Sequence, residues 1–158
     1  MTTCPFDPRA FLVSGIEKGA ARLKADLLAI PAGAATVAQA EGARTPVNIV
    51  AECGVLTGYL ADKINDHAHT IDHDHLVETT EKYTTVDAAL QCLAKNTSKL
   101  VGSIQSLNEH SLQTEVEMFG RQWSLFELCA LNITHLSYHD GQLNYIQMLN
   151  GDTENHWG

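Results

Sequence analysis

The sequence predicts an all-α fold, a four-helix bundle with a long crossover connection between the second and third helices. Three observations support this class. Apolar residues recur at three-to-four spacing over four long segments. Each segment begins at a residue typical of a helix N-cap. None of the remaining stretches alternates polar and apolar residues convincingly enough to predict a strand.

The first helix is bounded by a proline at each end. Asp7 is a suitable N-cap and Pro8 occupies the first helical position, where its missing N–H costs nothing. Pro31 ends the pattern, because proline cannot continue a helix. The apolar face is expected to comprise Leu12, Ile16, Ala20, Leu23, Leu27 and Ile30.

The second helix follows a predicted loop. Residues 31–43 are small and glycine-rich, which is typical of a connection. Thr45 and Pro46 then repeat the combination of N-cap and proline that opens the first helix. The inward residues of this second helix are expected to be Ile49, Cys53, Leu56, Leu60 and Ile64.

The third helix is reached through residues 65–83, which show no sustained period and predict a long connection with at most a short helical turn. Thr84 and Asp87 form a Thr-x-x-Asp variant of the capping box. We therefore expect the helix to begin there and continue to about residue 107. Its apolar positions are Val86, Leu90, Leu93, Thr97, Leu100, Ile104 and Leu107.

The fourth helix has a full Ser-x-x-Glu capping box, from Ser124 to Glu127. Asn150 and Gly151 are a typical helix stop, since both tolerate a left-handed backbone. The stretch before it, around Gly120, shows poor alternation and no clear element. The inward positions of this helix are expected to be Leu125, Leu128, Asn132, His135, His139, Gln142 or Leu143, Ile146 and Leu149.

Length and composition predict one soluble domain over residues 1–158. The chain has 158 residues and 44% hydrophobic residues, enough to close a single core. Its formal charge of −9 argues against nucleic acid or an anionic membrane as partner, since both require clustered Lys and Arg. A small-molecule substrate remains the expected partner.

The cysteines predict a reducing compartment. Cys4, Cys53, Cys92 and Cys129 show no paired spacing, and three of them fall in apolar helical patterns. The amino-terminal stretch lacks the basic and apolar regions of a signal peptide, and the apolar runs are too short to span a membrane. We therefore expect a cytoplasmic protein.

Two histidines interrupt the apolar face of the fourth helix, in the stretch HLSYHDGQ. His135 and His139 are four residues apart, which separates them by about 40° around the helix and about 6 Å along it. Two imidazoles in this arrangement can share one metal ion. Buried histidines that only accept or donate a hydrogen bond are the competing interpretation.

A third ligand is available on the second helix. Glu52 lies beside the inward positions of that helix, where a carboxylate is costly unless it is paired, protonated or bound to a cation. Two histidines and one carboxylate suit Zn, Ni, Fe(II) or Mn. Cys53 is a competing third ligand that would favour zinc.

A second group of histidines lies in the connection between the second and third helices. We interpret these as solvated loop residues rather than a site, because aspartates are interleaved with them. Gly141 weakens the helix, and the sequence indicates either a close packing contact or room for a ligand beside Gln142. The histidines of this second group are His67, His69, His73 and His75.

These features resemble the DinB/YfiT-like family of bacterial metal-binding four-helix bundles. The resemblance rests on the opening helix, the Thr-Pro start of the second helix, the long crossover and the motif H-x-x-x-H-x-x-Q, here His135, His139 and Gln142. It implies an up-down-down-up bundle, a homodimer, and a divalent metal held by three histidines. The helix-two histidine of the family falls at Glu52 in this chain.

The resemblance implies a function that uses a low-molecular-weight thiol, because characterised members of the family include thiol-dependent transferases and isomerases. Metal would bind the thiol as a thiolate and so lower its pKa. The hypothesis is a metal-dependent thiol S-transferase or related detoxification enzyme, with Gln142 as a cofactor-binding residue. Two alternatives stay open: a hydrolase with a metal-bound water, and a non-catalytic dimeric bundle or sensor of metal or a small ligand.

Overall fold

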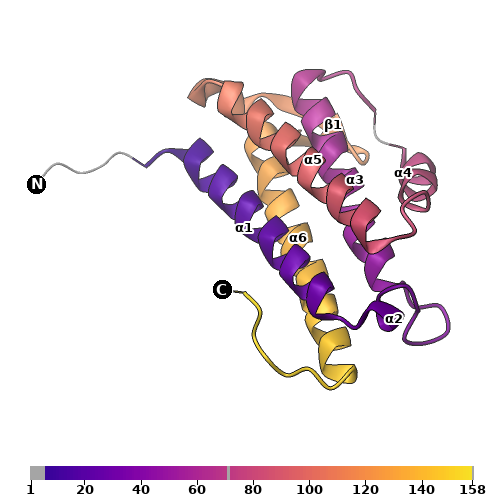
Figure 1. Cartoon of the computed structure of the whole chain (residues 1–158). Coiled ribbons are helices and arrows are strands. Elements are labelled where there is room, and N and C mark those ends of the chain that lie inside the picture. The colour runs from indigo at the N-terminus through magenta and orange to yellow at the C-terminus, as the bar shows by residue number, and fades with distance from the viewer. Residues whose placement is uncertain (1–5, 71, 158) are drawn as a thin grey trace, which may run out of the picture.

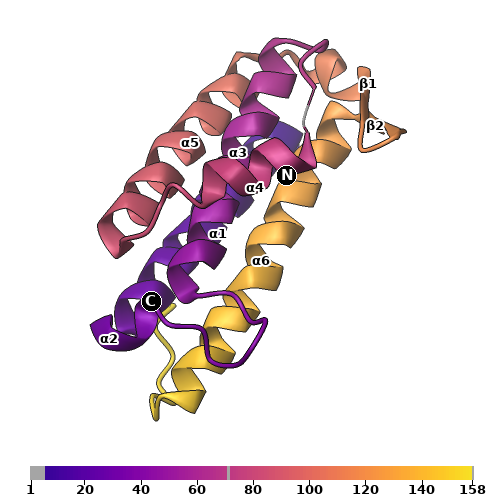
Figure 2. The same ribbon diagram turned by 90° about the vertical axis from the view of Figure 1, so that its right-hand side faces the viewer.

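Four long helices lie side by side in the computed structural model, which describes residues 6–70 and 72–157 (Figure 1). The first and last of the long helices, α1 and α6, run in one direction, and the two between them in sequence, α3 and α5, run in the other (Figures 1 and 2). The predicted all-α bundle is therefore confirmed, with its up-down-down-up order. The helices are α1 (Pro8–Ala29), α3 (Pro46–Asn65), α5 (Val86–Ser106) and α6 (Leu125–Leu149).

The caps predicted for α1 and α3 are present. Asp7 accepts a hydrogen bond from the backbone N–H of Arg9 at 2.9 Å, and Thr45 Oγ1 accepts one from Asn48 N at 3.1 Å. These bonds satisfy N–H groups that have no partner inside the helix. All six apolar positions expected for α1 are buried. The proline signals therefore locate both helices correctly.

The connections contain more structure than the sequence predicts. The predicted loop 31–43 begins with a short helix, α2 (Ala32–Ala35), because its alanines favour helix despite the glycine among them. The crossover includes α4 (His73–Thr80), which packs against α3 (Figure 2). Asp72 caps α4 by accepting a hydrogen bond from Asp74 N at 3.1 Å.

The start predicted for the third long helix is wrong by one residue. Thr85, not Thr84, is the N-cap of α5, and its Oγ1 accepts a hydrogen bond from Ala88 N at 3.2 Å. The predicted box between Thr84 and Asp87 does not form. Two adjacent threonines offer the same capping chemistry, and only the packing of the helix selects between them.

A β-hairpin before α6 is a second correction, because the sequence showed no convincing strand. Strands β1 (Glu115–Met118) and β2 (Arg121–Ser124) pair antiparallel, following the 3₁₀ helix η1 (Glu109–Gln113). Phe119 and Gly120 form the tight turn with φ of 54° and 74°, as a two-residue hairpin turn requires. The hairpin ends at Ser124, whose predicted capping box with Glu127 is present.

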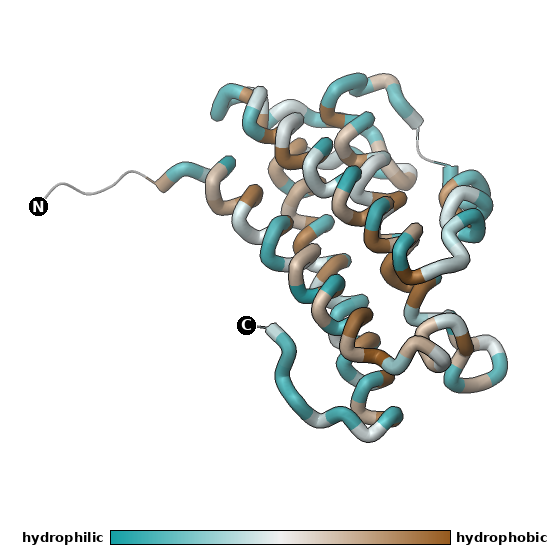
Figure 3. Tube along the Cα trace, in the orientation of Figure 1, coloured by the Kyte–Doolittle hydropathy of each residue, from teal (hydrophilic) through white to brown (hydrophobic). Residues whose placement is uncertain are grey.

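The core lies between the long helices, which supply most of its apolar residues, and η1 and β1 add Leu112, Val116 and Met118. Figure 3 shows hydrophobic residues recurring along the long helices. Leu149 was predicted to be inward but is 56% exposed, because α6 extends beyond the end of the core there. Cys53, Cys92 and Cys129 are buried as free thiols, and Cys4 lies outside the described residues. Of the helices in the described ranges, none combines the length and apolarity needed to cross a membrane.

Candidate metal centre

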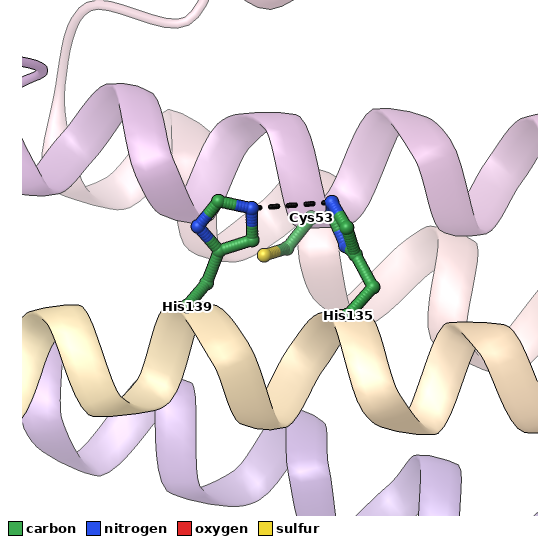
Figure 4. A group of neighbouring side chains, drawn as sticks. All are labelled: Cys53, His135 and His139. Atoms are coloured by element: carbon green, nitrogen blue, oxygen red, sulfur yellow. Dashed lines mark hydrogen bonds between the residues drawn. The ribbon is translucent and has the colours of Figure 1, made fainter.

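The two histidines of α6 point toward α3 and meet. Nε2 of His135 and Nε2 of His139 are 3.1 Å apart, and the two rings pack edge to face with centroids 4.4 Å apart. One helical turn separates the residues, so both side chains leave the same face of α6 (Figure 4). The structure therefore brings together the pair that the motif singles out.

Gln142 fixes the orientation of the His139 ring. Its amide oxygen lies 2.7 Å from Nδ1 of His139, and an amide oxygen can only accept a hydrogen bond. The proton of the neutral ring is therefore on Nδ1, and Nε2 presents a lone pair to the centre. A partner of this kind on the far ring nitrogen is typical of metal-ligating histidines.

The protonation state of His139 suits a ligand. Burial, followed by the nearness of His135, lowers the pKa of His139 below its ordinary value of 6.5. The imidazole is therefore neutral at neutral pH, the form in which histidine binds metals. Nδ1 of His135 has no hydrogen-bond partner within residues 6–70 and 72–157, so in the metal-free centre the proton of that ring lies on Nε2, which donates to Nε2 of His139.

Cys53 lies across from the two rings on α3. Its sulfur and the ligand nitrogens of His135 and His139 all lie within 4.8 Å of one another, as Figure 4 shows. Burial raises the pKa of the Cys53 thiol well above its ordinary value, so the sulfur stays protonated unless a metal displaces the proton. Cys53 can thus serve either as a ligand or as a small apolar core residue.

Glu52 approaches the same centre from α3. Its two carboxylate oxygens are each 3.8 Å from an imidazole Nε2, one from His135 and the other from His139. The side chains of Glu52 and His135 are 20% and 18% exposed and that of His139 is 5% exposed, so His139 is the most buried of the three. The structure thus brings the three residues predicted as metal ligands into one cluster.

Arg44, from the connection before α3, forms a salt bridge with Glu52. Burial alone would raise the pKa of Glu52, but the nearby His135 and the positive charge of Arg44 outweigh it and lower the pKa to about 2. The carboxylate is therefore ionised. Arg44 is itself held by Asn48, whose side-chain and backbone oxygens accept hydrogen bonds at 2.8 and 3.1 Å.

The arrangement fits a small divalent cation. Donor atoms about 2.0–2.2 Å from a tetrahedral metal lie about 3.4 Å from each other. The 3.1 Å between the two imidazole nitrogens is close to this value, and Glu52 lies 3.8 Å from His135 through Oε1 and 3.8 Å from His139 through Oε2. The fit requires that the proton of His135 sit on Nδ1 and that Arg44 give up its contact with Glu52.

Arg44 is a residue of the candidate site that sequence reasoning missed. It lies in a connection without periodicity, so no pattern placed it beside the centre. The available signal was the inward carboxylate of Glu52, which needs a cation in any environment of low polarity. A basic residue one position before the cap of the same helix was within reach to supply it.

The inward Asn132, one turn before His135, has a neutral partner instead. Its side-chain amide donates to Thr57 Oγ1 at 2.9 Å, and Thr57 donates in turn to the backbone oxygen of Cys53 at 2.7 Å. These bonds join α6 to α3 directly beneath the centre. Asn132 therefore fixes the position of the two helices rather than facing the cluster.

Gly141 makes no close packing contact, so that part of the prediction is wrong. A Cβ added at Gly141 would have no atom within 4 Å apart from its own helix and neighbours. The residue instead borders a cavity of about 780 Å³, which Arg44 and Gln142 also line. The predicted alternative, room for a ligand beside Gln142, agrees with this geometry.

A pair of buried carboxyl groups lies on the opposite side of α6, between Asp140 and Asp26 of α1. Burial, followed by contact with Asp26, raises the pKa of Asp140 to about 7. Asp26 accepts hydrogen bonds from Asn144 at 2.6 Å and from the indole N–H of Trp157 at 3.1 Å. This pair joins α6 to α1 and to the carboxy-terminal tail.

Known structures share this architecture. A mutant of a mycothiol-dependent maleylpyruvate isomerase superposes with a TM-score of 0.72 at 16% identity, over 90% of this chain and 63% of the isomerase. A DinB-like protein of Bacillus subtilis superposes with a TM-score of 0.65 at 20% identity, over 91% of this chain and 94% of that protein. The chain has a DinB-like fold. A protein of Streptococcus pneumoniae gives a TM-score of 0.71 at 15% identity, over 91% of this chain and 92% of the other.

The DinB-like likeness is one of structure. No known family model matches the sequence, and no curated protein matches it. This chain spans 63% of the length of the isomerase, so the isomerase includes a part without a counterpart here. The comparisons therefore show the fold, and the candidate metal cluster rests on the geometry of Cys53, His135 and His139.

Proposed function

We propose that the protein is a metal-dependent S-transferase for low-molecular-weight thiols, acting in detoxification or a related reaction. One observation carries the proposal: two imidazole nitrogens and a donor from α3 converge in the interior of a DinB-like bundle. A similar fold serves a mycothiol-dependent isomerase. The match to that enzyme supports a thiol as the co-substrate.

His135, His139 and Glu52 would hold the metal, with Cys53 as the competing third ligand. A divalent metal bound there would supply a Lewis acid that lowers the pKa of a bound thiol. Gln142 keeps the proton of His139 on Nδ1, and so directs its lone pair to the centre. The Tyr138 ring, 5.0 Å from the His139 ring, shields the same imidazole from water.

The test is a conjugation assay with 1-chloro-2,4-dinitrobenzene and several bacterial thiols, including mycothiol and bacillithiol. In this reaction the thiol sulfur forms a bond to the ring carbon, chloride leaves, and the thiol proton passes to the buffer. We expect Zn²⁺- or Ni²⁺-loaded protein to accelerate thioether formation and metal-stripped protein not to. Rates at the background level for every thiol and metal would contradict the proposal.

A second candidate, a non-catalytic bundle, is favoured by one specific observation. Arg44 neutralises Glu52, and the two imidazoles can hydrogen-bond to each other, so the charge of the carboxylate is balanced without a metal. Elemental analysis of protein purified without a histidine tag separates the two candidates. A metal bound in stoichiometric amounts supports the transferase, and its absence after incubation with Zn²⁺, Ni²⁺, Fe²⁺ and Mn²⁺ leaves the packing role.

A further inference from the structure

A cavity of about 780 Å³ opens beside the candidate centre, between α6 and the connection that leads into α3. Pockets of this size accommodate small organic ligands. Its walls are mainly apolar and aromatic, and the Tyr138 and Tyr145 rings are more than half exposed. The apolar part of the lining is supplied by Ile49, Ile146, Leu149 and the two tyrosines.

Gly141 contributes space to this cavity. A glycine inside a helix lowers the stability of that helix relative to alanine. Elsewhere in the chain a glycine of this kind makes room for a neighbour: a Cβ at Gly54 would lie 2.8 Å from the backbone nitrogen of Leu93. At Gly141 the added atom would meet nothing within 4 Å. The missing side chain therefore enlarges the cavity next to Gln142, and it is not needed to avoid a clash with a neighbouring residue.

Arg44 is the charged residue of this cavity, and within the described part of the chain no other charged residue lines it. The same side chain also borders a smaller cavity on the other side, which Glu52 lines. Its guanidinium is committed to Glu52 and to Asn48. Arg44 thus stands between the candidate centre and the larger cavity, and one change of partner would turn it toward the cavity.

We propose that the cavity binds a carboxylate-bearing organic ligand, and that Arg44 binds its carboxylate once a divalent metal has taken Glu52 from the guanidinium. The inference rests on the proposed function, for which it names the chemical class of the co-substrate or substrate. The ligand has an apolar or aromatic body, which the tyrosines and aliphatic residues contact. Its carboxylate lies at the end nearest the metal.

The exchange follows from the charges at the centre. A dication coordinated by Glu52 would engage the carboxylate lone pairs to which Arg44 now donates, and would repel the guanidinium at short range. Arg44 stays near through its bonds to Asn48, which do not involve Glu52. An arginine released in this way is a planar donor suited to bidentate binding of a carboxylate.

Metal and carboxylate binding must therefore be coupled. If metal releases Arg44 for the ligand, then the ligand also strengthens the binding of metal by the same factor. The geometry predicts positive coupling for carboxylates and none for neutral molecules of the same shape. An aromatic carboxylate and its amide are matched probes for this difference.

The first experiment measures binding of 3-phenylpropionate and 3-phenylpropanamide by calorimetry, with and without Zn²⁺. We expect Zn²⁺ to strengthen binding of the carboxylate by about fivefold or more, within the usual range of coupling between two sites, and to leave the amide unchanged. Equal effects on both probes, or no effect of Zn²⁺ on the carboxylate, would overturn the proposal. The same coupling in Arg44→Gln would also overturn it, because the carboxylate would then bind the metal directly.

The second experiment releases Arg44 without a metal. Glu52→Gln removes its charged partner, so metal-free Glu52→Gln should bind 3-phenylpropionate several-fold more tightly than metal-free wild type. The double variant Arg44→Gln with Glu52→Gln should lose that gain, and persistence of the gain there would refute the role of Arg44. If wild type binds no metal but Glu52→Gln behaves as expected, the proposed function fails and the assignment of Arg44 stands.

A third variant locates the ligand. Gly141→Leu places a side chain in the open space beside Gln142 and adds a good helix former, so its melting temperature should not fall. We expect Zn²⁺ binding to persist and binding of 3-phenylpropionate to be lost. Unchanged affinity for the carboxylate in a folded Gly141→Leu protein would show that the ligand binds elsewhere.

Discussion

Two groups of histidines lie in this chain, and they behave differently. Those of the crossover are dense in sequence, yet the backbone oxygens of His67 and His69 accept hydrogen bonds from Lys63 Nζ at 2.7 Å each. The rings of His69 and His75 pack on Tyr59, with centroids 6.1 and 6.0 Å from its ring. Through these contacts the histidines attach the crossover to α3. Among residues 6–70 and 72–157, the donor atoms of Cys53, His135 and His139 lie within 4.8 Å of one another, and none of the crossover histidines belongs to such a group.

The difference teaches that spacing on a defined element matters more than density in sequence. On α6, four residues return the chain to the same face, so His135 and His139 must converge. In the crossover, no regular backbone relates one side chain to the next until α4 begins at His73. A loop therefore scatters its imidazoles, whereas a helix aligns them.

The largest effect on metal binding should come from removing the two histidines of α6, with removal of two crossover histidines as the comparison. We expect His135→Ala with His139→Ala to reduce bound metal from roughly one ion per chain to background, since two ligands are lost. The matched control, His73→Ala with His75→Ala, should keep its metal. Elemental analysis after gel filtration gives both values. Loss of metal from the crossover variant, and not from the α6 variant, would contradict this prediction.

The next effect concerns the third ligand. Glu52→Gln should weaken Zn²⁺ binding by more than about a hundredfold, beyond the usual cost of losing a partner outside the coordination sphere. Cys53→Ser should change it little if the carboxylate is the ligand. Competition with a chromophoric chelator measures both affinities, and circular dichroism checks that each variant folds. The opposite ranking would assign the third ligand to Cys53.

A smaller effect is expected at Gln142. Gln142→Leu removes the acceptor that keeps the proton of His139 on Nδ1, and should lower Zn²⁺ affinity by about 10- to 100-fold. Gln142→Glu retains an acceptor and should recover most of the affinity. An unchanged affinity in Gln142→Leu would mean that the ring is oriented by packing alone.

The smallest effect is a displacement of the pH profile of Zn²⁺ binding. Because burial and His135 lower the pKa of His139, protons compete with metal for its lone pair only at a pH below the ordinary titration of histidine. Zn²⁺ retention should therefore extend to lower pH in this protein than on an exposed histidine tag, whose pKa is about 6.5. A titration of bound Zn²⁺ against pH measures the difference. Release of Zn²⁺ at the same pH as from the tag would contradict the assignment of the buried His139 as a ligand.

The four helices could be predicted because their ends carry strong local signals. Asp7 with Pro8, Thr45 with Pro46, and Ser124 with Glu127 each specify a helix start by hydrogen bonds within a few residues. The β-hairpin was missed for a different reason. Its strands have four residues each: β1 alternates exposed and buried residues, but over only four positions, and β2 has no fully buried residue.

The site was less accessible to sequence reasoning than the fold. The helical spacing of His135 and His139 was sufficient to place them together, since both lie on one element. Arg44 reaches Glu52 from a connection, and its conformation depends on hydrogen bonds to Asn48. Such a contact follows from the tertiary path of the loop, on which periodicity carries no information.

The carboxyl pair behind α6 bears on how far this helix can move around the candidate centre. Asp140 follows His139 directly, so it faces α1 while His139 faces α3. The bond from Asn144 to Asp26 holds α6 from that side, as the bond from Asn132 to Thr57 does from the other. The helix cannot slide or turn to suit an incoming ion without breaking these contacts. The scaffold thus fixes the backbone positions from which the two imidazoles leave α6, and an ion entering the candidate site would have to be met by rotation of the side chains.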